Sequence, residues 1–155
     1  VKEMQLIKLY QLVIVTSQEF NMPIDNSNVL RALLDHLAEN YAPLNVFYTF
    51  RVKMMEAIVY AKKESASHHV VKHYFTKFVG DYIQFVESAG FKLIKTWALP
   101  SDVQISPFET LVSHLYLNGH FNWNRLSAKE VVALWLENVQ LSEGAQGLLT
   151  DSGEE

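Results

Sequence analysis

The stretch SHHVVKHYFTKFVGDYIQFVESAG, residues 67–90, sets the fold class of this 155-residue chain. Its apolar and aromatic residues return at steps of three and four, so they share one face of a helix: Val71, Tyr74, Phe75, Phe78, Tyr82, Phe85, Val86 and Ala89. Ser67 is a residue type that caps the start of a helix, and Gly90 is a residue type that ends one in the left-handed conformation. The stretch predicts one long amphipathic helix over His68–Ala89.

Further segments of helical length precede it. Residues 44–63 are apolar nearly all round a helix, which is typical of a central one. Residues 28–41 carry apolar side chains at helical spacing and follow the capping candidates Asp25 to Ser27. Residues 1–20 could hold a strand at Leu12 to Val15, but their length and the lack of a partner strand favour a helix.

Two Ser-x-x-Glu capping boxes mark the beginnings of the last helices. Ser106 to Glu109 begins a helix that Gly119 ends, and Ser127 to Glu130 begins the final helix. The connection over residues 91–106 is irregular, with room for one short helix or turn around Lys95 to Leu99.

The predicted architecture is all-α. A single-domain helical bundle of about six helices covers residues 1–149, with two long central helices over 44–63 and 68–89. Residues 150–155 are small, polar and acidic, and we expect them to form a flexible tail. The hydrophobic fraction of 49% supplies a sizeable core and excludes a disordered chain.

Charge and cysteine content exclude several classes of function. The 13 basic and 17 acidic side chains leave a net charge of -4, so the chain lacks the positive field with which nucleic-acid binders displace counterions. It has no cysteine, which excludes a disulfide scaffold, a thiolate nucleophile and cysteine-ligated zinc. The apolar segment over residues 6–15 is too short to span a bilayer, which needs about 20 apolar residues. We therefore expect a cytoplasmic protein that makes no direct contact with nucleic acid or membrane.

Candidates for metal binding and catalysis are incomplete. His69 and His73 stand four residues apart beside His68, but no third ligand falls on that helix face within one turn. Glu56 has apolar neighbours and could be a buried acid, although the pattern favours an exposed Glu56 paired with nearby Lys53 or Lys63. Nucleophile motifs and phosphate-binding glycine loops are absent from the sequence. We expect no catalytic residue, no metal site and no cofactor, and we do not expect an enzyme.

Aromatic residues are concentrated on the two central helices, together with methionines. One interpretation is that these side chains only fill the core. The other is an apolar cavity with a few polar tips, as small-molecule sites between the helices of a bundle are built. On that interpretation a small apolar ligand contacts Phe50, Met54, Tyr74, Phe78 and His114, the last of which stands in an otherwise apolar helix.

The last two helices also carry wide apolar faces. These faces could pair with the same helices of a second copy as a four-helix interface, formed by Leu111, Leu115, Trp123 and Trp135. They could instead close the core of their own chain, and the sequence leaves both interpretations open.

Four segments follow one another in an order known from a protein family: a helix ending in FVESAGF (85–91), a link LPSD (99–102), a helix ending in LYLNGHF (115–121), and the closing segment SAKEVVALWLENVQ (127–140). This order resembles the C-terminal regulatory domain of the TetR/AcrR transcriptional repressors, over residues 28–140. The resemblance implies a ligand pocket among the central helices and a dimer built by the two closing helices. Nothing in residues 1–26 resembles the family's helix-turn-helix, so the resemblance implies no DNA contact by this chain.

Two functional hypotheses follow. The first is a ligand-sensing and dimerisation domain of a TetR-like regulator, in which a small apolar effector between the central helices shifts the packing of the last pair. The alternative is a non-enzymatic adaptor domain of a larger protein, whose apolar helix faces form a groove for a protein partner.

Overall fold

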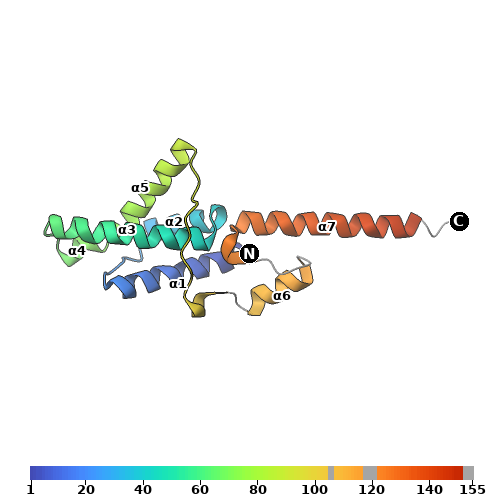
Figure 1. Cartoon of the computed structure of the whole chain (residues 1–155), viewed down its shortest axis with the longest axis horizontal. Helices are drawn as coiled ribbons and strands as arrows, with labels where there is room; N and C mark the ends of the chain where they lie inside the picture. The colour runs from blue at the N-terminus through green and yellow to red at the C-terminus, as the bar shows by residue number, and fades with distance from the viewer. Residues whose placement is uncertain (105–106, 117–121, 152–155) are drawn as a thin grey trace.

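The computed structural model describes residues 1–104, 107–116 and 122–151, and in these ranges it contains helices and no strand (Figure 1). The α-helices are α1 (Lys2–Phe20), α2 (Asn28–Asn40), α3 (Pro43–Lys63), α4 (His68–Val71), α5 (Tyr74–Ala89), α6 (Pro107–Tyr116) and α7 (Ala128–Asp151), and the 3-10 helices are η1 (Ser101–Val103) and η2 (Trp123–Arg125). All the α-helices except the four-residue α4 have 10 residues or more, which confirms the all-α prediction. None of the described helices is long and apolar enough to cross a membrane.

Several helix ends have the predicted caps. At the start of α2, Ser27 Oγ accepts a hydrogen bond from the Leu30 amide at 3.2 Å. At the start of α7, Ser127 and Glu130 form a reciprocal capping box, in which each side chain accepts a hydrogen bond from the other residue's amide at 3.1 Å. Gly90 ends α5 with a φ of 71°. These local signals therefore confirm the sequence interpretation at three helix ends.

Parts of other predictions fall outside the described residues. They are the N-cap Ser106, the helix end at Gly119, and residues 152–155 of the predicted tail. Within the described part, α7 continues through Thr150 to Asp151, so helical structure extends into the segment predicted to be a tail.

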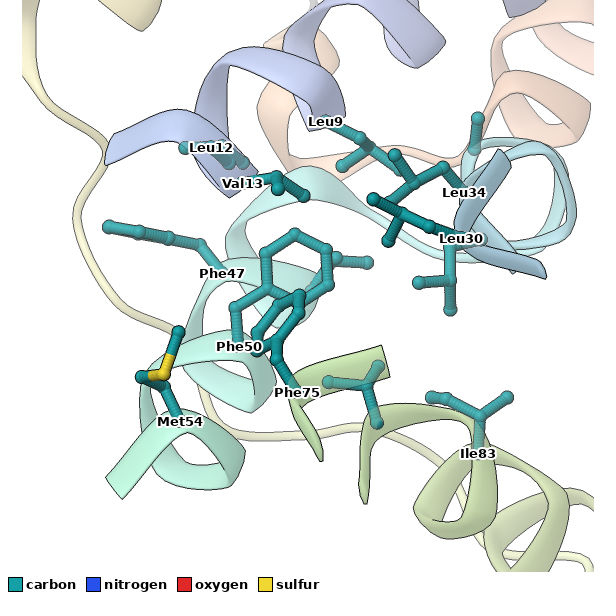
Figure 2. Close-up of a cluster of buried hydrophobic side chains, with 14 of the residues drawn as sticks. Leu9, Leu12, Val13, Leu30, Leu34, Phe47, Phe50, Met54, Phe75 and Ile83 are labelled. Carbon is teal, nitrogen blue, oxygen red and sulfur yellow. The ribbon is translucent and has the colours of Figure 1, made fainter. Parts of the chain in front are cut away.

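The main core lies between α1, α2, α3 and α5, with α3 in contact with both α1 and α5. Its fully buried side chains include Leu9, Leu12, Leu34, Leu37, Phe47, Phe50, Phe75 and Val79. Figure 2 shows Phe50 of α3 beside Phe75 of α5, and their ring centroids are 5.1 Å apart in an edge-to-face arrangement. The helix predicted over residues 44–63 is therefore the central one.

The predicted continuous helix over residues 68–89 is wrong at one place, because α4 ends at Val71 and α5 begins at Tyr74. The Lys72 carbonyl would accept a hydrogen bond from the amide four residues on in a continuous helix, but it accepts one from the Asp25 amide at 3.0 Å. The Asp25 amide, in the loop between α1 and α2, thus replaces the amide that would donate to Lys72 within a continuous helix. Val70 and Val71, the β-branched residues at the end of α4, have a low helix propensity and favour the same break.

The connection after α5 is irregular over residues 91–100, as predicted, and its short helix is η1 at Ser101–Val103 rather than one around residues 95–99. It runs from the end of α5 across α3 (Figure 1). The Trp97 amide donates to the Leu44 carbonyl at 3.2 Å, and Asn45 Nδ2 donates to the Lys95 carbonyl at 3.1 Å. Two backbone groups of this segment, the Trp97 amide and the Lys95 carbonyl, thus form hydrogen bonds with α3 rather than within the segment.

Candidate functional site

A buried polar cluster joins α6 and η2 to α1. Lys8 Nζ lies 2.5 Å from Glu109 Oε1 and 2.5 Å from Asn124 Oδ1. The three residues are 5%, 1% and 4% exposed. Burial lowers the pKa of Lys8, and the Glu109 carboxylate opposes part of that effect. A closed cluster of this kind cannot admit a ligand, so we assign it a structural role, the attachment of α6 to α1.

Hydrogen bonds also fix η2 beside the start of α1. Gln5 Nε2 donates to the carbonyls of Trp123 and Leu126 at 2.8 and 2.9 Å. The Trp123 indole donates to Ser113 Oγ of α6 at 2.8 Å. Trp123 is 1% exposed and forms a second core cluster with Val131 of α7. The beginning of α7 is therefore held against α1, α6 and η2.

The first half of α7 carries apolar residues on two faces. On the inner face, Val131 is 1% exposed and Leu134 packs against the second core cluster. A second set is exposed: Val132 at 36%, Trp135 at 42%, Leu136 at 54% and Val139 at 38%. Their spacing of i, i+3, i+4 and i+7 places these four residues, the outer stripe of α7, on one side of the helix. Beyond them α7 projects away from the other helices (Figure 1).

Helix α6, which contacts α7, exposes a similar row. Phe108, Leu111 and Leu115 are 58%, 52% and 60% exposed, and they recur at steps of three and four. Single exposed apolar residues are ordinary on protein surfaces, whereas rows on neighbouring helices are typical of docking surfaces.

The residues predicted to form an interface are divided between surface and core. Leu111, Leu115 and Trp135 are exposed on α6 and α7. Trp123 lies inside the second core cluster, where it holds η2 in place. The assignment of an interface stays a prediction, and three of its four residues lie on the surface that it requires.

The five residues predicted to line a ligand cavity lie in three different places. Phe50 and Met54 are 0% and 1% exposed and belong to the main core (Figure 2). His114 is exposed on α6. The remaining two, Tyr74 and Phe78, lie on α5. The structure thus does not gather the five side chains around one ligand.

Tyr74 and Phe78 belong to an aromatic cluster with Tyr60 of α3. The Tyr60 ring centroid lies 5.2 Å from that of Tyr74 and 5.5 Å from that of Phe78, both edge to face. Tyr60 is 41% exposed, and with Phe78, Met55 and Val59 it lines a surface depression of about 410 Å³. These rings are therefore a surface feature of α3 and α5 rather than part of the core.

A different cavity, of about 370 Å³, lies where residues 92–95 pass α3 and α5. Its lining consists of Tyr48, Thr49, Val52, Lys53, Tyr82, Lys92, Leu93, Ile94 and Lys95. Lys53 Nζ lies 4.3 Å from the centroid of the Tyr82 ring, and Lys95 Nζ lies 5.8 Å from that of the Tyr48 ring. None of the five predicted ligand-binding residues lines this cavity, which we call the lysine–tyrosine cavity.

The histidine and carboxylate candidates do not form a reactive centre. The described ranges contain no group of three or more His, Cys, Asp or Glu side chains that could hold a metal ion. His73 Nδ1 lies 3.7 Å from Asp25 Oδ2. Glu56 is exposed and accepts hydrogen bonds from Lys53 at 2.9 and 3.1 Å, which confirms the interpretation of Glu56 as a paired surface residue.

Comparison with protein-family models, with curated proteins and with solved structures found no match. The helical fold agrees with the TetR/AcrR resemblance at the level of fold class only. Because a fold class hosts many functions, the all-α fold class does not by itself identify the function of this chain.

The sequence interpretation did not predict the buried cluster around Lys8 or the lysine–tyrosine cavity, although the sequence contains an indication of each. Lys8 interrupts an apolar run in α1, and a lone lysine in such a run indicates either an exposed edge or a buried partner. Lys92 and Lys95 flank the apolar pair Leu93 and Ile94 in the segment after α5. Lys8 contacts Glu109 and Asn124, which lie about a hundred residues further along the chain, and Lys92 and Lys95 line a cavity with residues of α3 and α5. Only the tertiary structure identifies these neighbours.

Proposed function

We propose that this chain is a helical protein-interaction domain that pairs with a second copy of itself through α6 and α7. The outer stripe of α7 is the observation that carries the proposal. The inner face of α7 already packs on its own chain, yet four further apolar residues form a second row on the same helix. A second row at i, i+3, i+4 and i+7 is the pattern by which one helix packs along another.

The size of the surface suits a modest interface. The seven exposed apolar residues of α6 and α7 each present on the order of 80 Å², or roughly 600 Å² together, from the areas usual for large side chains. A standard interface buries about 800 Å² on each partner. The flanking polar residues would therefore have to contribute, as they do at the rim of most interfaces.

Charges beside the stripe support a second copy as the partner. Lys129 and Glu143 are exposed, and each lies seven residues from Leu136, one on either side. Seven residues are two helical turns, so both charges flank the same edge of the outer stripe. In an antiparallel pair of α7 helices centred near Leu136, Lys129 of one copy lies opposite Glu143 of the other. The chain is thus complementary to itself in that orientation.

The TetR-like hypothesis is the finer form of this proposal. In it the pair of α7 helices belongs to a regulator, and a bound effector shifts the packing of α6 and α7. The adaptor hypothesis uses the same surface but assigns it to the helix of another protein. The two differ in whether the isolated chain associates with itself.

Sedimentation equilibrium of the chain over a range of concentrations tests the proposal. We expect a monomer–dimer equilibrium that Leu136→Glu shifts strongly towards the monomer, because the substitution places a charge at the centre of the stripe. The matched control is Val29→Glu, which makes the same change at an α2 residue that is 69% exposed, and it should leave the equilibrium unchanged.

A wild-type chain that remains monomeric at several hundred micromolar contradicts pairing with a second copy and leaves the adaptor hypothesis. Equal dissociation by Leu136→Glu and Val29→Glu would place the dimer contact elsewhere.

A further inference from the structure

The lysine–tyrosine cavity is separate from the surface of α6 and α7 that the proposed pairing uses. Its volume of about 370 Å³ lies within the range of about 300–1,000 Å³ in which small-molecule sites fall. It is formed by α3, by α5 and by the extended segment that follows α5. Hydrogen bonds between Asn45 and Lys95 and between Leu44 and Trp97 fix that segment on α3, so this wall of the cavity is held in place without a ligand.

The cavity concentrates positive charge in a chain whose net charge is -4. Three lysines line it, Lys53, Lys92 and Lys95, and its described lining includes no carboxylate. Lys53 is paired with Glu56 at 2.9 Å, whereas no ion pair involves Lys92 or Lys95 among the residues that the structure describes. Two uncompensated ammonium groups at one concave site favour an anion.

The rest of the lining is apolar and aromatic. The rings of Tyr48 and Tyr82 lie on α3 and α5, and each has a lysine Nζ over its face. Ile94 at the rim is 83% exposed, which leaves an apolar side chain in water unless something covers it. Such walls favour a flat or acyl body over an inorganic ion, because only an apolar body would remove this surface from water.

We propose that the lysine–tyrosine cavity binds a small molecule in which a carboxylate is attached to an aromatic or acyl body. Lys92 and Lys95 bind the carboxylate, and the body packs against Tyr48, Tyr82 and Ile94. Lys53, held by Glu56, maintains the position of the Tyr82 ring.

Titration of the ¹⁵N-labelled full chain, followed by amide chemical shifts, tests this assignment. The probes are 2-naphthoate and its neutral analogue 2-naphthamide, which share one shape, and dodecanoate, which separates an acyl body from an aromatic one. The test variant is Lys92→Gln/Lys95→Gln. Its control is Lys62→Gln/Lys77→Gln, which changes the net charge equally at two exposed lysines outside both the cavity and the surface of α6 and α7.

We expect at least one carboxylate probe to shift amides of residues 48–53, 82 and 92–95. Binding of that probe should be about tenfold weaker in Lys92→Gln/Lys95→Gln and unchanged in the control, which corresponds to about 1.4 kcal/mol. The amide analogue should bind wild type about tenfold more weakly than 2-naphthoate if the aromatic probe is the one that binds.

Three results would each overturn the proposal: no saturable shift with any carboxylate probe at millimolar concentration, equal weakening in both double variants, or shifts centred on other residues. Because the readout is local to α3, α5 and residues 92–95, it succeeds or fails independently of the association of α6 and α7.

Discussion

Replacing Lys8 by methionine should destabilise the fold far more than replacing a surface lysine. The substitution keeps most of the side-chain length but removes the ammonium that lies 2.5 Å from Glu109 Oε1 and 2.5 Å from Asn124 Oδ1. The Lys8 and Glu109 side chains are only 6% and 1% exposed, so water cannot take over the role of the missing cation. Breaking a buried pair by removing one partner costs about 3–5 kcal/mol. That is a large share of the roughly 5–15 kcal/mol by which a domain is stable.

Urea unfolding followed by circular dichroism at 222 nm gives the free energy of unfolding of each variant. Lys2→Met is the control, because Lys2 pairs with Asp35 at 3.0 Å on the surface, where ion pairs contribute little. The double variant Lys8→Met/Glu109→Met removes both charges and should recover most of the loss, to within about 2 kcal/mol of wild type. It also keeps the test informative if Lys8→Met alone does not fold.

A cost below about 1 kcal/mol for Lys8→Met would refute the reasoning, since it would mean that Glu109 is not held by a buried cation. So would a double variant as unstable as Lys8→Met, because the loss would then come from packing and not from the buried charge of Glu109.

Further predictions concern α5 and the core. Hydrogen bonds from His36 and Tyr41 lower the pKa of Glu87, so its contribution to stability is present above its ordinary pKa of 4.5 and is lost as the pH falls through the lower folded value. Urea unfolding between pH 6 and 3 should therefore show a shallower decline for Glu87→Gln than for wild type, and parallel curves would contradict this. Gly90→Ala should lower the free energy of unfolding by about 1 kcal/mol, because Gly90 has a φ of 71°. Gly80→Ala, inside α5, should raise it by about 0.5–1 kcal/mol. If both substitutions change the stability in thermal unfolding in the same direction, this reasoning is wrong. Phe50→Ala should cost about 3–5 kcal/mol in the same assay, and a cost below 1 kcal/mol would mean that Phe50 is not the close-packed centre of the core.

Local signals predicted most of the fold. The caps at Ser27, Gly90 and Ser127 and the apolar circumference of residues 44–63 depend on neighbours within a few residues, which the sequence displays directly. The break between α4 and α5 was not predicted, because it depends on the Asp25 amide, which reaches the Lys72 carbonyl from a distant loop.

The candidate sites were less accessible to sequence reasoning. Phe50 and Tyr74 lie on neighbouring helices with similar aromatic patterns, yet one is in the core and the other in a surface cluster. Periodicity shows that a residue lies on an apolar face but does not show which element covers that face. One wall of the lysine–tyrosine cavity is formed by residues 92–95, which have no helical or strand periodicity and lie beside α3 and α5. The sequence pattern therefore did not indicate this cavity.

The pairing of α7 with a second copy is tested most directly by cross-linking, because the chain contains no cysteine of its own. Lys129→Cys and Glu143→Cys are prepared separately, mixed in equal amounts and oxidised mildly. In the antiparallel pair, residue 129 of one copy lies opposite residue 143 of the other, whereas two copies of residue 129 are about 21 Å apart along the helix. We expect the mixed disulfide dimer to predominate strongly over both symmetric dimers. A statistical mixture of the three dimers, a predominance of symmetric dimers, or no cross-linking at a concentration where the chain is dimeric would contradict the pairing.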